Sequence, residues 1–224
     1  MKTSANTVSR PAENPVMRKA NVLDGLRAFG IMLGGSASLV GTAPLCVGAT
    51  AAALARGRRP HPLALAGTAG TVAYALVVHP RLMTWGARPD EQIASLPGDE
   101  FVADAGIQTT RAVTVEAPVG EVWPWLAQLG QDRAGFYSYE WLENLAGCRM
   151  RNADVLHPEW QEREVGETVK LHWAHGLELT RLEPNRVFAL GGWYLVLERD
   201  DGRSRLIART RFPRGPATAA YDFC

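Results

Sequence analysis

Polar side chains that could bind a ligand or exchange protons gather in one short stretch of the chain. Arg133, Tyr137, Glu143 and Asn144 occupy a predicted loop and the helix that follows it. No pattern singles out a catalytic residue, and Tyr137 and Glu143 are the candidates that remain for general acid-base chemistry. Arg133, Tyr137 and Asn144 are also candidates for ligand binding. A structural ion pair between Arg133 and Glu143 is the alternative interpretation.

Aromatic side chains flank this stretch and recur in the later part of the chain. Phe136, Tyr139, Trp173 and Trp193 are candidates for lining an apolar ligand pocket, where large rings supply much of the contact area. Rings on half-buried strands also form ordinary core. Both interpretations are open for all four residues.

Common catalytic and metal-binding patterns are missing from the sequence. It has no GxSxG, HExxH or P-loop motif, and its three cysteines have no metal or redox spacing. His172 and His175 would face opposite sides of a strand, so they chelate a metal only if a turn intervenes. The net charge of +1 gives no reason to expect a nucleic acid partner. We therefore expect no metal and no cofactor.

Two uncharged stretches near the N-terminus are predicted to form a membrane hairpin. A helix over residues 28–55 would extend roughly 40 Å, more than the ~30 Å hydrocarbon core. Residues 63–78 are shorter and reach a full span if the helix continues to Trp85. Arginines and prolines in residues 56–62 form the turn. The number of basic residues that flank the hairpin favours cytoplasmic ends, whereas the density of arginines in the turn favours the opposite orientation; cytoplasmic ends are the prediction.

Small residues favour close packing of the two predicted helices. Gly30 and Gly34 form a GxxxG pattern, and Ala66 and Gly70 repeat the spacing in the second stretch. Two other interpretations are a buried hairpin of a soluble protein and a cleaved signal sequence.

The remainder of the chain is predicted to fold as one α+β domain. A strand at residues 107–116 precedes two helices, and strands joined by short turns then imply a curved antiparallel sheet. The later predicted strands are residues 168–173, 177–182, 186–190, 193–199 and 203–212. The predicted division of the chain is a flexible tail (1–25), a two-helix membrane hairpin (26–86), a linker (87–106) and the α+β domain (107–224).

Several motifs of this domain occur together. They are EAPVGEVWPWL (116–126), GQDRAGFYSYEWLEN (130–144), RNAD (151–154), PEWQ (158–161), VGETV (165–169) and RLIARTR (205–211). Together they resemble the SRPBCC (START-like, polyketide cyclase/dehydrase) superfamily, and in particular a bacterial branch with N-terminal membrane segments. The resemblance implies a helix-grip fold, in which a curved sheet wraps a long C-terminal helix around an apolar ligand.

The end of the chain departs from this family pattern. Twelve residues follow Phe212, and none of them forms an amphipathic stretch long enough to be the gripped helix. Either the domain is C-terminally incomplete, through truncation or a frameshift, or another element fills the groove. Arg205, Arg209 and Arg211 share one strand face, which is expected to be a solvated outer face or a contact with an anionic membrane surface.

The sequence therefore predicts a membrane-tethered, non-catalytic module that binds a lipid-like or polyketide-like ligand. Its expected partners are that ligand and a lipid bilayer contacted by residues 28–55 and 63–78. The expected location is the bacterial inner membrane, with the soluble domain facing the cytoplasm. The alternatives are a cyclase or dehydratase that uses the same pocket, and a truncated protein that has lost ligand binding.

Overall fold

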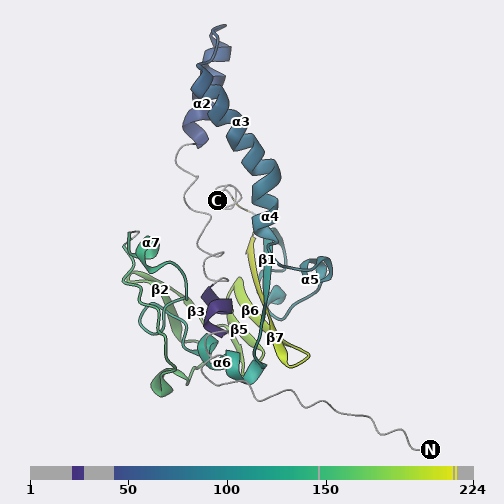
Figure 1. Cartoon of the computed structure of the whole chain (residues 1–224), viewed down its shortest axis with the longest axis vertical. Coiled ribbons are helices and arrows are strands. Elements are labelled where there is room, and N and C mark those ends of the chain that lie inside the picture. The colour runs from purple at the N-terminus through teal and green to yellow at the C-terminus, as the bar shows by residue number, and fades with distance from the viewer. Residues whose placement is uncertain (1–21, 28–42, 146, 214, 216–224) are drawn as a thin grey trace, which may run out of the picture.

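Strand-forming residues after residue 104 build an antiparallel sheet (Figure 1). The computed structural model describes residues 22–27, 43–145, 147–213 and 215. Five strands form a curved sheet in the order β1-β7-β6-β5-β4, and β2 and β3 form a separate two-stranded sheet. The strands are β1 (Ala105–Val115), β2 (Thr168–His172), β3 (His175–Glu178), β4 (Arg181–Glu183), β5 (Val187–Leu190), β6 (Trp193–Asp200) and β7 (Arg203–Pro213).

The predicted α+β order is confirmed. Two helices, α6 (Val119–Ala127) and α7 (Glu140–Leu145), follow β1, and the 3-10 turn η4 (Pro158–Trp160) precedes β2. The predicted hairpin between the last two strands is confirmed as well. Asp201 and Gly202 both have positive φ, 46° and 80°, which is the conformation that a two-residue hairpin turn requires.

The prediction of one continuous strand over residues 177–182 is wrong. The chain changes partners in the middle of this stretch, because the Leu179 N–H donates to Glu167 whereas the Thr180 N–H donates to Ala189. The first part therefore pairs with β2 and the second part with β5.

The inner face of the large sheet carries the larger apolar core. Trp125 and Leu126 of α6 are buried there. Residues 22–27 are helical and join the same core, with Val22 and Leu26 only 1% and 3% exposed. Four residues assigned to the tail, 22–25, belong to this segment, and the prediction for residues 1–21 lies outside the described residues. The segment covers part of the inner face, where the family resemblance implied a C-terminal helix.

The outer face of the sheet is covered by the polar segment that follows residue 87. Its helices are α5 (Pro89–Ile93) and the 3-10 turn η3 (Asp99–Val102). Arg205 forms a bidentate pair with Glu91, at 2.7 and 2.8 Å, and Arg209 forms an ion pair with Asp99 at 3.0 Å. The two arginines are 7% and 1% exposed. The prediction that this face is solvated or meets a membrane is therefore wrong, because these arginines are buried and paired with carboxylates.

A helical arm projects from the domain (Figure 1). It consists of α2 (Ala43–Ala55), α3 (Pro62–Ala73), a π-helical turn η2 (Tyr74–Val78) and α4 (His79–Met83). The continuous helix Pro62–Met83 is 22 residues long and apolar enough to cross a membrane. None of its residues is buried in the protein. It continues beyond residue 78, as a full span requires. Residues 28–42 of the first predicted helix lie outside the described residues.

The two helices of the arm touch through small residues. The Thr50 and Thr68 hydroxyl oxygens are 2.9 Å apart, and a Cβ on Gly67 would collide with the Cys46 sulfur. Ala66 and Gly70, the small residues singled out in the sequence, are exposed. The GxxxG pattern of Gly30 and Gly34 lies outside the described residues.

The base of the arm is bound directly to the sheet. The Arg111 Nε–H on β1 donates to the Leu82 carbonyl at 2.7 Å, and the Ala112 N–H donates to the Trp85 carbonyl at 3.0 Å. Arg205 on β7 adds a hydrogen bond to the Gly86 carbonyl at 2.6 Å. Because the edge strand β1 and its neighbour β7 both hold the end of the helix, its direction relative to the sheet is fixed.

Removing the buried guanidinium of Arg209 should lower the stability of the domain strongly. Arg209→Met keeps an apolar stem but removes the ion pair with Asp99 and the hydrogen bond to the Ala94 carbonyl. We expect a loss of about 3 to 5 kcal/mol in the free energy of unfolding. Denaturant titration of the full chain in detergent measures it. The exposed Arg199→Ala is the matched control and should stay within about 0.5 kcal/mol of the parent.

Acid should weaken the same face. Burial raises the pKa of the Asp99 carboxyl, but hydrogen bonds from Tyr194, the Leu96 N–H and Arg209 outweigh it and hold the pKa below 3.8. A lowered folded-state pKa stabilises above the ordinary value and is lost as the pH falls through the folded-state value. Thermal midpoints should therefore drop between about pH 5 and pH 2. Asp99→Asn should be less stable near neutrality and lose less on acidification; equal acid sensitivity in both proteins would contradict this assignment.

Candidate ligand cavity

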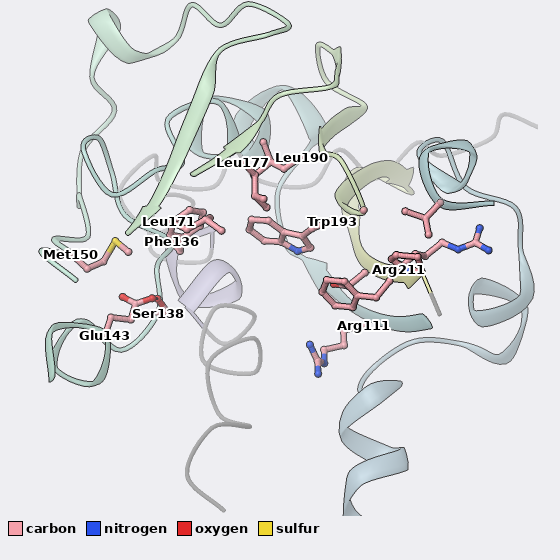
Figure 2. Close-up of a pocket in the computed structure, with 15 residues that line it drawn as sticks. Arg111, Phe136, Ser138, Glu143, Met150, Leu171, Leu177, Leu190, Trp193 and Arg211 are labelled. Atoms are coloured by element: carbon pink, nitrogen blue, oxygen red, sulfur yellow. The ribbon is translucent and has the colours of Figure 1, made fainter. Parts of the chain in front are cut away.

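A cavity of about 570 Å³ lies between the large sheet and the small β2–β3 sheet. It falls within the ~300 to 1,000 Å³ range of small-molecule sites. Most of its wall is apolar, and Figure 2 shows the side chains that form it. Its apolar side chains include Phe136, Met150, Leu171, Leu177, Leu190 and Trp193. The polar side chains in its wall are Arg111, Ser138, Glu143, Thr210 and Arg211.

An aromatic pair forms one wall of the cavity. The Phe136 and Trp193 ring centroids are 5.7 Å apart with the planes tilted by 50°. Phe136 comes from the loop after α6, and Trp193 begins β6. Beneath this pair lies a void of about 20 Å³, which Tyr137 borders. The aromatic pair thus separates the cavity from the tightly packed core.

Glu143 of α7 is the carboxyl group of the cavity wall. The Ser138 hydroxyl donates to its Oε1, and its Oε2 is buried without a hydrogen-bond partner among the described residues. Burial raises the pKa of the Glu143 carboxyl, the nearby Glu140 carboxylate raises it further, and the Ser138 hydrogen bond only partly offsets them. The site therefore favours the neutral form of this carboxyl more than water does.

Two arginines lie at the opposite side of the cavity. The guanidinium of Arg111 binds the Leu82 carbonyl, and that of Arg211 forms an ion pair with Asp99 at 3.2 Å. Figure 2 shows both guanidinium groups directed away from Trp193. These residues line the cavity largely with their carbon stems, so its centre is apolar.

Three of the sequence candidates line the cavity: Phe136, Glu143 and Trp193. Tyr137 does not, because it is only 2% exposed beneath the aromatic pair. Its hydroxyl donates to the Trp125 carbonyl at 3.1 Å and accepts a hydrogen bond from Gln128 at 2.9 Å. The two acid-base candidates, Tyr137 and Glu143, therefore do not both line the cavity.

The other candidates lie outside the cavity wall. Tyr139 and Trp173 are 41% and 64% exposed. The Asn144 side chain binds the Met150 backbone N–H and carbonyl at 2.6 and 3.0 Å. Arg133 donates to the Trp160 carbonyl and pairs with Glu167 at 3.6 Å. The alternative ion pair between Arg133 and Glu143 is therefore wrong.

Sequence reasoning missed most of the apolar wall. Leu171 and Leu177 belong to a pattern in which apolar residues alternate with polar ones along β2 and β3. Val169 and Leu179 continue that pattern into the core, with exposures of 1% and 0%. This alternation was the available signal. Arg111 and Val102 carried none, because they reach the cavity through tertiary packing alone.

A turn does intervene between His172 and His175, which pair across the β2–β3 hairpin with ring centroids 6.0 Å apart. Within the described residues, no group of three or more potential metal ligands occurs.

No protein-family model, curated protein or solved structure matched the chain. The case for a function therefore depends on the cavity and the helical arm.

Replacing Glu143 should change how stability depends on pH. A carboxyl whose folded-state pKa is raised above 4.5 costs stability as the pH climbs past that value, because the unfolded chain ionises first. Glu143→Gln cannot ionise. Its thermal midpoint relative to the parent should rise between about pH 4 and pH 7. The exposed Glu198→Gln on β6 is the control, and a parallel rise in both variants would contradict the assignment.

Proposed function

We propose that this protein is a membrane-tethered module that binds a small apolar ligand, lipid-like or polyketide-like, without catalysing a reaction. The cavity is the observation that carries the proposal: its wall is mainly aliphatic and aromatic, and the polar groups are few. Such a chamber selects molecules that gain by leaving water. The sheet, the short helices and the cavity are compatible with the helix-grip fold that the SRPBCC resemblance implies.

The membrane part of the proposal draws support from the path of the chain. Residues 22–27 lie in the same core as the sheet, so the chain leaves the domain and returns to it before β1. If the helix Pro62–Met83 crosses a bilayer, the chain must also cross in the opposite direction upstream. Two crossings make a hairpin with both ends on one side. We place that side in the cytoplasm of a bacterial cell, in agreement with the flanking basic residues.

Tethering would place the cavity beside the bilayer in which its ligand dissolves. Arg111 both lines the cavity and holds the base of the apolar helix through the Leu82 carbonyl. A ligand that partitions into the bilayer is concentrated there, and the hairpin keeps the binding site within reach.

The residues in the cavity favour binding over catalysis. Of the two acid-base candidates, the Tyr137 hydroxyl is buried and bound to Trp125 and Gln128. Glu143 remains as one titratable group at the wall, and acid-base chemistry on a reactive chain commonly needs a second group for the opposite proton transfer.

Filling the cavity tests the proposal. Leu177→Trp adds an indole to a wall position that is 37% exposed and so tolerates a larger side chain. Val165→Trp, at a 60% exposed position outside the cavity wall, is the matched control. We expect the parent and the control to co-purify with a stoichiometric apolar molecule detected by mass spectrometry. We expect Leu177→Trp to bind a fluorescent long-chain fatty acid about tenfold more weakly or worse.

Two outcomes would contradict the proposal. One is a well-folded parent protein that carries no small molecule and does not bind the fatty acid probe. The other is a Leu177→Trp variant that keeps the parent's thermal midpoint and its full affinity, since the cavity would then not be the binding site.

A further inference from the structure

Four large apolar side chains stand exposed beside the cavity and form an aromatic rim: Tyr139, Trp141, Leu145 and Trp173. Their exposed fractions are 41%, 67%, 79% and 64%. Isolated exposed apolar residues are normal, but contiguous groups mark interaction surfaces. None of these four side chains belongs to either core cluster.

Local contacts hold the members of the aromatic rim together. Tyr139 immediately precedes α7, and its ring centroid lies 6.3 Å from that of Trp141. The end of α7 meets the β2–β3 turn, where the Cys148 sulfur lies 3.8 Å from the Leu171 carbonyl oxygen. A Cβ on Gly147 would lie 3.6 Å from the His172 ring. Trp173 follows in that turn, so it shares one end of the domain with α7.

The aromatic rim lies at the end of the domain from which the arm projects. Figure 1 shows α7 at that end, near the level of α4. Figure 2 shows Ser138 and Glu143 at one side of the cavity and Arg111 at the other, near the helix of the arm. The rim and the base of the apolar helix therefore flank the cavity.

Composition and charge favour a bilayer surface as the occupant. Tyrosine and tryptophan prefer the headgroup level of membranes, where an apolar ring and a polar edge are both satisfied. The carboxylates of α7 face inward, since Glu140 accepts a hydrogen bond from the Asn152 N–H and Glu143 lies in the cavity wall. Arg149 and Arg151, just beyond α7, are exposed and suit anionic headgroups.

We propose that the aromatic rim docks into the headgroup region of the bilayer that the arm enters, so that the cavity opens onto the membrane surface. This inference rests on the proposed function, because it assumes that Pro62–Met83 crosses that bilayer. It adds a second membrane contact, on the far side of the cavity from the arm. A ligand could then pass between bilayer and cavity without crossing water.

Depth-dependent quenching of a fluorescent label tests the docking. The full chain, with its cysteines replaced by serine, would carry an NBD label at Leu145→Cys and be reconstituted into phosphatidylethanolamine and phosphatidylglycerol vesicles. The control label is at Ile93→Cys, which is 87% exposed on α5 over the outer face of the sheet. We expect lipids spin-labelled near the headgroup to quench the Leu145 label at least about threefold more strongly than the control.

A rim variant separates docking from tethering. Trp141→Glu combined with Trp173→Glu should abolish the excess quenching at Leu145 while the protein stays in the membrane through its arm. Equal quenching at both labels in a protein that remains membrane-bound would overturn the docking proposal and leave the proposed function standing. A protein released from vesicles by alkali would instead overturn the tethering on which both depend.

Protein concentration separates the bilayer from a second copy of the chain. If the aromatic rim meets lipid, the emission of the Leu145 label is unchanged when the protein is diluted about tenfold into more vesicles. A shift of that emission toward the spectrum of a water-exposed label on dilution would show that two copies cover the rim. That result would overturn the docking proposal.

Discussion

Arg205 and Arg209 hold the outer face of the sheet in place, and the arrangement of the molecule depends on them. Each guanidinium is nearly inaccessible and is satisfied by a carboxylate from the segment that covers this face. An unpaired buried charge would cost several kcal/mol, so the sheet and its cover form together or not at all. Arg205 also binds Gly86, which ties the end of the apolar helix to the same pairing. The direction of the arm and the attachment of the covering segment thus depend on the same arginine.

The local features of the fold could be predicted from the sequence, because they depend on neighbouring residues. The turn at Asp201 and Gly202 and the position of α6 after Pro118 follow from backbone preferences. The outer face could not be predicted in the same way. A strand bearing Arg205 and Arg209 has the pattern of a solvated surface, and only the tertiary fold brings Glu91 and Asp99 to it.

The candidate site likewise has residues that could be predicted from the sequence and residues that could not. Phe136 and Trp193 could be proposed from the sequence because large rings supply much of the contact area in apolar pockets, and both line the cavity. Tyr137 has the same apparent chemistry in the sequence, but its positive φ of 57° turns its side chain into the core. Of these two adjacent loop residues, Phe136 lines the cavity and Tyr137 is buried in the core, and no periodicity in the sequence distinguishes them. The Tyr137 N–H donates a hydrogen bond to the Asn152 Oδ1 at 2.8 Å, and this contact with a distant loop helps to set that conformation.

The packing of residues 22–27 against the sheet has a consequence for biosynthesis. A ribosome makes this short helical segment before the arm, whereas Val115 on β1 and Leu195 on β6, which lie close to it, are made only after the arm. Val22, Leu23 and Leu26 must therefore wait for their partners in the sheet until the arm and these strands have been made. Contacts between such distant parts of a chain form slowly. During this period the apolar side chains of Val22, Leu23 and Leu26 are available to chaperones or to the membrane-insertion machinery.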